Sequence, residues 1–136
     1  MNCARTLLIV ALLALCASTF LVPAQPAAAA WGNVQLRIVT QNTTAKFTYV
    51  SVQGMNQRRD NVTWQRSFSP ATSTASTDGW WWNASRKTII VHFDNGVRLS
   101  CGVFHNAYPS SNWETVRIGP DGSVSASGPS NSCARI

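Results

Sequence analysis

The sequence predicts one small all-β domain, a single β-sandwich of six to eight short antiparallel strands with one disulfide. Three observations support this fold class. Apolar residues alternate with polar ones in several short segments, and beyond the first thirty residues no window keeps apolar residues at helical spacing. Turn residues separate these segments at intervals of about 8 to 12 residues. Two cysteines remain in the part that is expected to fold.

The first thirty residues have the features of a secretory signal peptide. A basic start is followed by an almost unbroken apolar run over residues 6–22, and small residues end the segment at 28–30. A membrane-spanning helix needs about 20 apolar residues, whereas Pro23 ends this run earlier. We therefore expect residues 1–30 to be removed, with sites after 24 or 28 as alternatives, and residues 31–136 to form one secreted, extracellular domain.

The first half of this domain contains three expected strands. Alternation predicts strands at residues 34–38 and 47–50, and the polar turn between them, at residues 41–45, predicts that they form a hairpin. A third strand is expected at residues 62–68. Residues 69–79 are rich in Ser and Thr and are expected to form a loop.

The strongest local pattern lies between residues 87 and 104, where two apolar runs flank Asp94-Asn95-Gly96. Asn-Gly is the preferred pair for a two-residue type I′ turn, because both central positions need a positive φ. With that turn Phe93 faces Arg98, and apolar residues fall on both faces of the hairpin. A further strand is expected at residues 113–118, ended by a turn that contains Pro and Gly.

The cysteines indicate a disulfide. Cys3 and Cys16 leave with the signal peptide, so Cys101 and Cys133 remain in an oxidising compartment, where pairing is the default. The chain-entropy model gives such a bond roughly 3 to 4 kcal/mol of stabilisation, and it would tether a C-terminal segment rich in Gly, Ser and Pro. Two cysteines and two histidines do not make a typical zinc site, so neither a metal nor a cofactor is expected.

The charge of the chain and the absence of catalytic motifs in its sequence favour a binding protein over an enzyme. The mature part has ten basic and five acidic residues, a net charge of +5, which favours anionic partners such as phospholipid headgroups, bacterial envelopes or acidic glycans. No stretch is dense in Lys and Arg, so nucleic acid is not an expected partner. The chain has neither a nucleophile-elbow motif nor paired carboxylates. We therefore expect no enzyme, with a small secreted hydrolase as one alternative.

Tryptophan and cationic residues are the candidate binding groups. In the run Trp80-Trp81-Trp82, neighbours on a strand point to opposite faces. Either Trp81 enters the core while Trp80 and Trp82 share the outer face, or the reverse holds. Exposed indoles stack on sugar rings or lie at the boundary of a lipid bilayer. The adjacent cations Arg86 and Lys87 would suit a phosphate-bearing headgroup, so Trp80, Trp82, Arg86 and Lys87 are predicted to bind ligand.

A second aromatic patch precedes the strand at 113–118. Residues 111–118, Ser-Asn-Trp-Glu-Thr-Val-Arg-Ile after a Tyr/Pro loop, resemble the corresponding segment of actinoporins and the related aegerolysins, and residues 31–52 are similar to the start of aegerolysins. Those proteins are small secreted β-sandwiches that bind membrane lipid, and some of them form pores. The resemblance implies that Tyr108, Pro109 and Trp113 line a headgroup pocket, with Arg117 nearer the phosphate.

The chain also departs from actinoporins. It begins its first strand without an N-terminal amphipathic helix, and it has only Tyr108 where those proteins use several tyrosines, so pore formation by a single chain is not expected. The predicted function is a secreted cationic β-sandwich that binds membrane lipid or microbial envelope surfaces, in defence or as a cytolytic factor. The alternative binding function is a carbohydrate-binding module that uses exposed Trp. Three sequons, at Asn42, Asn61 and Asn83, are possible glycosylation sites.

Overall fold

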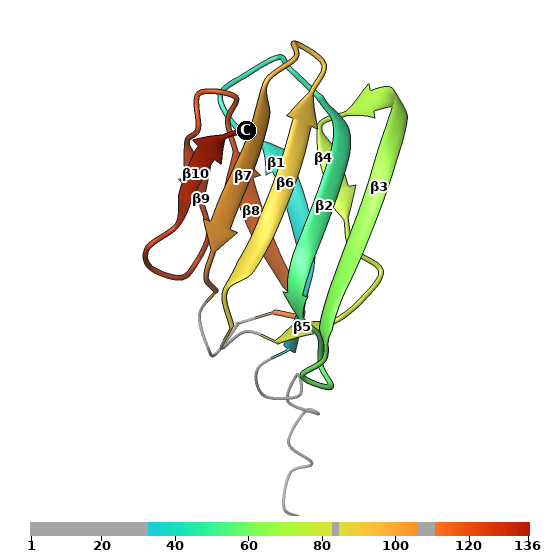
Figure 1. Ribbon diagram of the computed structural model, residues 1–136, viewed down its shortest axis with the longest axis vertical. Helices are drawn as coiled ribbons and strands as arrows, with labels where there is room; N and C mark the ends of the chain where they lie inside the picture. Colours follow the sequence, from blue (N-terminus) through green and yellow to red (C-terminus); the bar gives the residue numbers. More distant parts are fainter. Residues whose placement is uncertain (1–32, 83–84, 106–110) are drawn as a thin grey trace, which may run out of the picture.

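The computed structural model describes residues 33–82, 85–105 and 111–136, and these form ten strands (Figure 1). The strands are β1 (Asn33–Thr40), β2 (Phe47–Met55), β3 (Asn61–Thr72), β4 (Thr74–Ser76), β5 (Trp81–Trp82), β6 (Lys87–Phe93), β7 (Arg98–Val103), β8 (Trp113–Ile118), β9 (Val124–Ser125) and β10 (Ser132–Arg135). The all-β class is confirmed. The expected six to eight strands are too few, because β4, β5 and β9 are too short to show alternation. The expected signal peptide lies outside the described residues.

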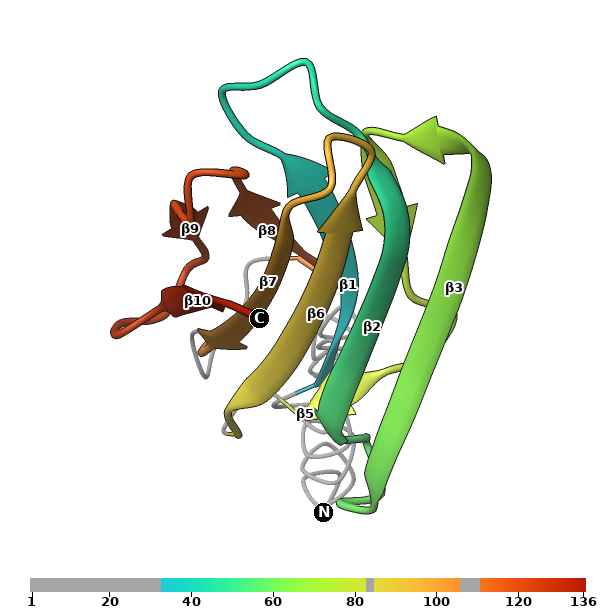
Figure 2. The same ribbon diagram turned by 45° about the horizontal axis from the view of Figure 1, so that its top comes forward.

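The strands are arranged in two five-stranded sheets. The first sheet has the order β4-β1-β8-β9, with β5 also pairing with β1, and the second has the order β10-β7-β6-β2-β3. Figure 2 shows β7, β6, β2 and β3 side by side as one layer, with β1 and β8 behind it. Among the described strands β1 and β8 run parallel and every other pair is antiparallel. The arrangement resembles a β-sandwich.

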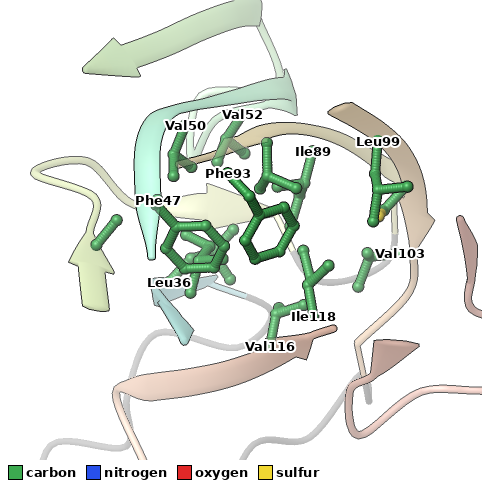
Figure 3. Packing of buried hydrophobic residues seen from close by; sticks show 14 of the residues in the cluster. Leu36, Phe47, Val50, Val52, Ile89, Phe93, Leu99, Val103, Val116 and Ile118 are labelled. Carbon is green, nitrogen blue, oxygen red and sulfur yellow. The ribbon is translucent and has the colours of Figure 1, made fainter. Parts of the chain in front are cut away.

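The core lies between the two sheets (Figure 3). Alternate residues of β1, β2, β6, β7 and β8 point inward and are almost completely buried. They are Val34, Leu36, Ile38, Phe47, Val50, Val52, Ile89, Val91, Phe93, Leu99, Cys101, Val103, Val116 and Ile118. Burial of each large apolar side chain contributes roughly 1.5 to 3 kcal/mol, so this shared interior holds the two sheets together.

The expected hairpin between the first two strands is wrong. β1 lies inside the first sheet between β8 and the short strands β4 and β5, whereas β2 lies in the second sheet between β6 and β3. Residues 41–46 therefore carry the chain from one sheet to the other. Alternation identifies a strand and its buried face, but it does not identify the neighbouring strand.

The hairpin between β6 and β7 is confirmed, but its turn and register differ from the expectation. Phe93 pairs with Val97 through a backbone hydrogen bond of 2.9 Å, and the Gly96 N–H donates to the Phe93 carbonyl at 3.1 Å. The loop therefore has three residues, and within it only Gly96 has a positive φ, of 84°. His92, rather than Phe93, faces Arg98. This shift by one residue places the buried residues of both strands on the inner face, and among the outward positions of the two strands Ile90 is the one apolar side chain.

Two further expectations concern the second half of the chain. The disulfide is confirmed, since Cys101 on β7 and Cys133 on β10 are bonded and lie directly opposite each other. The loop expected at residues 69–79 is largely wrong, because β3 continues to Thr72 and β4 follows at Thr74–Ser76. Threonine is β-branched and fits strands well, so a Ser/Thr-rich composition does not by itself exclude them.

Candidate functional site

The two ends of the fold differ in their residues. One end, here called the tryptophan end, is formed by residues 55–61, 79–82, 85–87, 103–105 and 111–114. Figure 1 shows β5 and the turn between β2 and β3 at this lower end of the molecule. Most of the side chains predicted to bind ligand lie here, because β1, β6 and β8 begin at this end and β2 and β7 finish there.

The three adjacent tryptophans adopt the first of the two expected arrangements. Trp81 is only 2% exposed, and its indole Nε1 donates a hydrogen bond of 3.1 Å to Oγ1 of Thr77. Trp82 points to the opposite face of β5 and is half-buried, as is Trp80, which precedes the strand. Trp81 therefore anchors the segment, and its two neighbours lie at the surface.

Trp113 and Arg117 share the outer face of β8, as a regular strand requires. Trp113 is 37% exposed, and the Arg37 guanidinium of neighbouring β1 lies 5.1 Å from the centroid of its ring. Trp82 has a similar partner, because the Arg59 guanidinium lies 4.6 Å from its ring centroid. We call these five residues, Arg37, Arg59, Trp82, Trp113 and Arg117, the cationic aromatic face.

The strand register fixes how these groups are spaced. Trp82 lies opposite Asn33 on one side of β1, and Trp113 lies opposite Gln35 on the other side. Two strand spacings across the sheet and two residues along it separate their Cα atoms by about 12 Å. The outward positions of the five strands of this sheet carry no acidic side chain; they are Asn33, Gln35, Arg37, Val39, Thr74, Ser76, Trp82, Trp113, Thr115, Arg117 and Ser125.

The turn between β2 and β3 places Arg59 against Trp82. Oδ1 of Asn56 accepts hydrogen bonds from the backbone N–H groups of Arg58 at 2.8 Å and Asp60 at 3.0 Å. These bonds hold Arg59 at a φ of 66°, a left-handed conformation that is unfavourable by roughly 1 to 2 kcal/mol for a residue with a side chain. Unfavourable backbone of this kind is concentrated at functional positions, and here it directs a guanidinium onto an indole.

A pocket of about 300 Å³ opens on the other side of the same turn. It lies between the edge strand β3 and the segment that precedes β5, and we call it the Trp64–Trp80 pocket. Its lining residues are Asn56, Gln57, Arg58, Val62, Thr63, Trp64, Gly79, Trp80 and Trp81. The two adjacent arginines of this turn therefore point to different sites. Arg58 lines the pocket, whereas Arg59 lies over the ring of Trp82.

Lys87 is not the surface cation that the sequence led us to expect. Its side chain is fully buried, and its Nζ donates hydrogen bonds to the backbone carbonyls of Trp82 and Ser85. Gly54 makes room for it, because a Cβ there would lie 2.9 Å from Cγ of Lys87. Burial lowers the pKa of Lys87 to about 8, although the charge of Glu114 acts in the opposite direction. Lys87 therefore positions the backbone next to Trp82 from inside the fold.

Arg86 is exposed, but it lies on the other sheet. Its guanidinium covers Gly102 of β7, where a Cβ would overlap it. Gly102 alternates with the inward residues Cys101 and Val103, so this is the outer face of the second sheet. Of the residues predicted to bind ligand, Trp82, Trp113 and Arg117 therefore lie together on one face. Trp80 lines the pocket instead. Arg86 and Lys87 lie neither on this face nor in the pocket.

A buried His105–Glu114 pair lies close to Lys87. Nδ1 of His105 is 3.6 Å from Oε1 of Glu114, which is too long for a hydrogen bond, and neither ring nitrogen has a hydrogen-bond partner among the described residues. Burial lowers the pKa of His105. Burial raises the pKa of Glu114, but His105 and the hydrogen bonds from Ser127 outweigh it and lower the pKa overall. The cluster connects the end of β7, β8 and the C-terminal segment.

Some predicted residues cannot be placed on the fold. Tyr108, Pro109 and Asn83 lie outside the described residues, whereas Asn42 and Asn61 are exposed. Within the described ranges no three His, Cys, Asp or Glu side chains gather as they would around a metal ion. The same ranges contain no helix with the length and apolar character needed to cross a membrane.

Sequence reasoning missed Arg37 and Arg59, although both are needed to describe the face. Arg37 alternates with buried residues of β1, which indicates an outward position, but its contact with Trp113 depends on the parallel pairing of β1 and β8. The chain matches no protein-family model, and the searches of curated proteins and of solved structures found no significant match. The arguments about function therefore depend on the geometry of this chain alone.

Proposed function

We propose that this chain is a secreted protein that binds anionic membrane surfaces through the cationic aromatic face. The observation that carries the proposal is the composition of this face. Two indoles and two guanidinium groups lie on outward positions of the first sheet, which carry no acidic side chain, and a third guanidinium, that of Arg59, comes from the turn between β2 and β3. Secretion is inferred from residues 1–30, and the net charge of +5 for the remainder favours the same kind of partner.

The form of the face suits a surface rather than an enclosed ligand. It is the outside of a β-sheet, and the Cα atoms of its two tryptophans lie about 12 Å apart. Indole rings are favoured at the membrane–water interface because they have an apolar body and one N–H donor. Arginine attracts anionic headgroups, each contributing about 1 kcal/mol near a negatively charged leaflet. Indole rings and guanidinium groups together therefore suit a surface that is both apolar and negatively charged.

The test is co-sedimentation of the mature protein with vesicles of phosphatidylcholine alone and of phosphatidylcholine with phosphatidylserine, at two salt concentrations. Replacing Arg37 and Arg117 by Gln should weaken binding about 30-fold at low salt, and less at high salt because exposed charges are screened within about 10 Å at 0.1 M. Trp113→Ala should weaken binding at both salt concentrations, because transfer of indole to the interface does not depend on ions.

Matched controls remove the same groups from the second sheet. Arg98 and Arg135 are exposed there, so their double change to Gln lowers the net charge equally without altering the face. Ile136→Ala similarly removes an exposed apolar side chain elsewhere. Equal loss of binding in face and control variants, with circular dichroism showing both folded, would reject the face. Retention of the protein by an insoluble acidic polysaccharide but by no vesicle would instead favour a glycan partner.

A further inference from the structure

We infer that the Trp64–Trp80 pocket is a second binding site and that it takes a single pyranose unit of a saccharide. Its volume of about 300 Å³ is at the lower end of the range of small-molecule sites, about 300 to 1,000 Å³. It forms where the two sheets meet at one edge, since β3 belongs to the second sheet and the segment before β5 leads into the first.

The indoles form walls and do not project from the surface. Trp64 occupies an inward position of β3, opposite Val52, packs against the core and is half-buried. Its Nε1 lies 3.5 Å from Oδ2 of Asp78, at the limit of a hydrogen bond. The indole N–H of Trp80 has no partner in the described part of the chain, so it remains available to a ligand. Flat apolar walls suit the C–H faces of a sugar ring, which stack on aromatic side chains.

Polar groups line the rest of the pocket. Oδ1 of Asn56 already accepts two backbone N–H groups, so its amide NH₂ is the part left for a ligand. Gln57 and Arg58 are exposed, and Thr63 adds a hydroxyl. None of the lining side chains is a carboxylate. Amide and guanidinium donors beside an amide oxygen are the groups that bind neighbouring sugar hydroxyls.

The pocket is already assembled without ligand. The backbone N–H of Gln57 donates to the carbonyl of Trp80 at 3.0 Å, and Asn56 forms a β-bridge with Trp81. These bonds fix the polar side of the pocket to its aromatic side. Because little ordering remains to be done on binding, the site is preorganised for a small ligand.

The experiment measures retention of the mature protein on insoluble chitin, cellulose, xylan and bacterial peptidoglycan, followed by fluorescence titration with the soluble tetrasaccharide of whichever polymer binds. Trp80→Ala should weaken binding at least tenfold, and Trp80→Phe should restore part of it. Gln57→Ala should weaken it about fivefold, and because Gln57 is exposed its replacement should not disturb the fold. Salt should have little effect on binding of a neutral polymer.

Trp113→Ala is the matched control, because it removes a tryptophan from the cationic aromatic face and leaves the pocket intact. It should bind saccharide like the wild type while losing vesicle binding, and Gln57→Ala should show the opposite pattern. The pocket is rejected if none of the four polymers retains the protein, if Gln57→Ala and a folded Trp80→Ala bind like the wild type, or if Trp113→Ala removes saccharide binding instead. None of these results decides whether the cationic aromatic face binds membranes, because the vesicle experiment tests that proposal separately.

Discussion

The two ends of the fold are built from different kinds of residue. The end opposite the tryptophans, here called the turn end, contains residues 41–46, 94–96 and 119–122. Its two tight turns have glycine at positive φ, with Gly96 at 84° and Gly122 at 91°, and residues 41–46 include Asn42 at 51°, a residue type that adopts this conformation more readily than most. At the tryptophan end a positive φ is adopted by Arg59, and Lys87 and His105 are buried.

The residues at the turn end are those expected from stability alone, whereas several at the tryptophan end are unfavourable for stability. Glycine at positive φ and exposed turn residues are favourable local choices. A strained arginine, a buried lysine and a buried histidine are unfavourable ones, and proteins retain such features mainly where function requires them. The tryptophan end is thus the part of the molecule where function is expected on physical grounds, independently of any motif.

The C-terminal segment holds the tryptophan end together. The backbone N–H of Gly128 donates to the Phe104 carbonyl at 3.2 Å, and the Phe104 N–H donates to Oδ1 of Asn131 at 2.8 Å. A Cβ at Gly128 would lie 2.6 Å from the Phe104 backbone, so the approach is close. Cys133 follows Asn131 by two residues, so we expect loss of the disulfide to affect the tryptophan end first.

The largest expected effect is the loss of this disulfide. Cys133→Ser should lower the free energy of unfolding by about 2 to 5 kcal/mol, measured by urea denaturation. Hydrogen exchange should accelerate more at the amide of Phe104 than at that of Phe93, the last residue of β6 before the 94–96 turn of the turn end. A double Cys101→Ser, Cys133→Ser variant controls for the free thiol. Uniform acceleration at both ends would contradict the expectation that the tryptophan end is affected first.

The second effect concerns Lys87, which faces Glu114 and two backbone carbonyls. Its pKa is about 8 in the folded protein against an ordinary 10.5. Between these pH values the unfolded chain binds a proton that the folded protein has released, so stability should rise with pH across this window. The gain should be at most about 3 kcal/mol, and this group should contribute no change well below pH 8, where it is protonated in both the folded and the unfolded chain.

The measurement is urea denaturation at several pH values from 7.5 to 10.5, for the wild type and Lys87→Met. Methionine has a similar length and no charge, so the variant should lack the rise that this lysine causes. Other titrating groups affect both proteins equally and cancel in the difference. Parallel profiles for the two proteins would mean that Lys87 is not desolvated in the folded state.

Much of the fold was predictable from local pattern. The strand expected at residues 113–118 matches β8, and the alternation of β1 marks its buried face correctly. The pairing of β6 with β7 was also predictable from its turn residues, but the partner of β1 was not. β1 pairs with β8 across about 80 residues of chain, whereas β2, the next strand in sequence, belongs to the other sheet. Pairing at that distance is set by packing of the whole core rather than by any local signal.

The candidate site shows the same limit. Trp82, Trp113 and Arg117 were identified by residue type, whereas Arg37 and Arg59 reach them only through strand pairing and a turn. The position of Lys87 could have been predicted, because it alternates with Ile89 and Val91, and this period places it inside. Its charge and its proximity to Arg86 in sequence outweighed that pattern in the prediction.

The smallest expected effect tests whether the two ends are independent. In Gly96→Val a β-branched residue must adopt a φ of 84°, while no atom lies within 4 Å of its Cβ, so the effect comes from the backbone alone. Thermal unfolding should show a loss of more than about 1 kcal/mol. Gly79→Val is the matched control, since Gly79 has equal space and no positive φ, and its stability should change by less than about 0.5 kcal/mol.

The same Gly96→Val variant should bind anionic vesicles like the wild type at temperatures where it is folded. The residues of the turn end contribute no side chain to the cationic aromatic face. Arg117 belongs to the face and lies close to the turn end, one residue before the end of β8. A loss of vesicle binding by folded Gly96→Val would show that the hairpin turn positions the face through the core. In that case the separation between an end that stabilises and an end that binds would have to be abandoned.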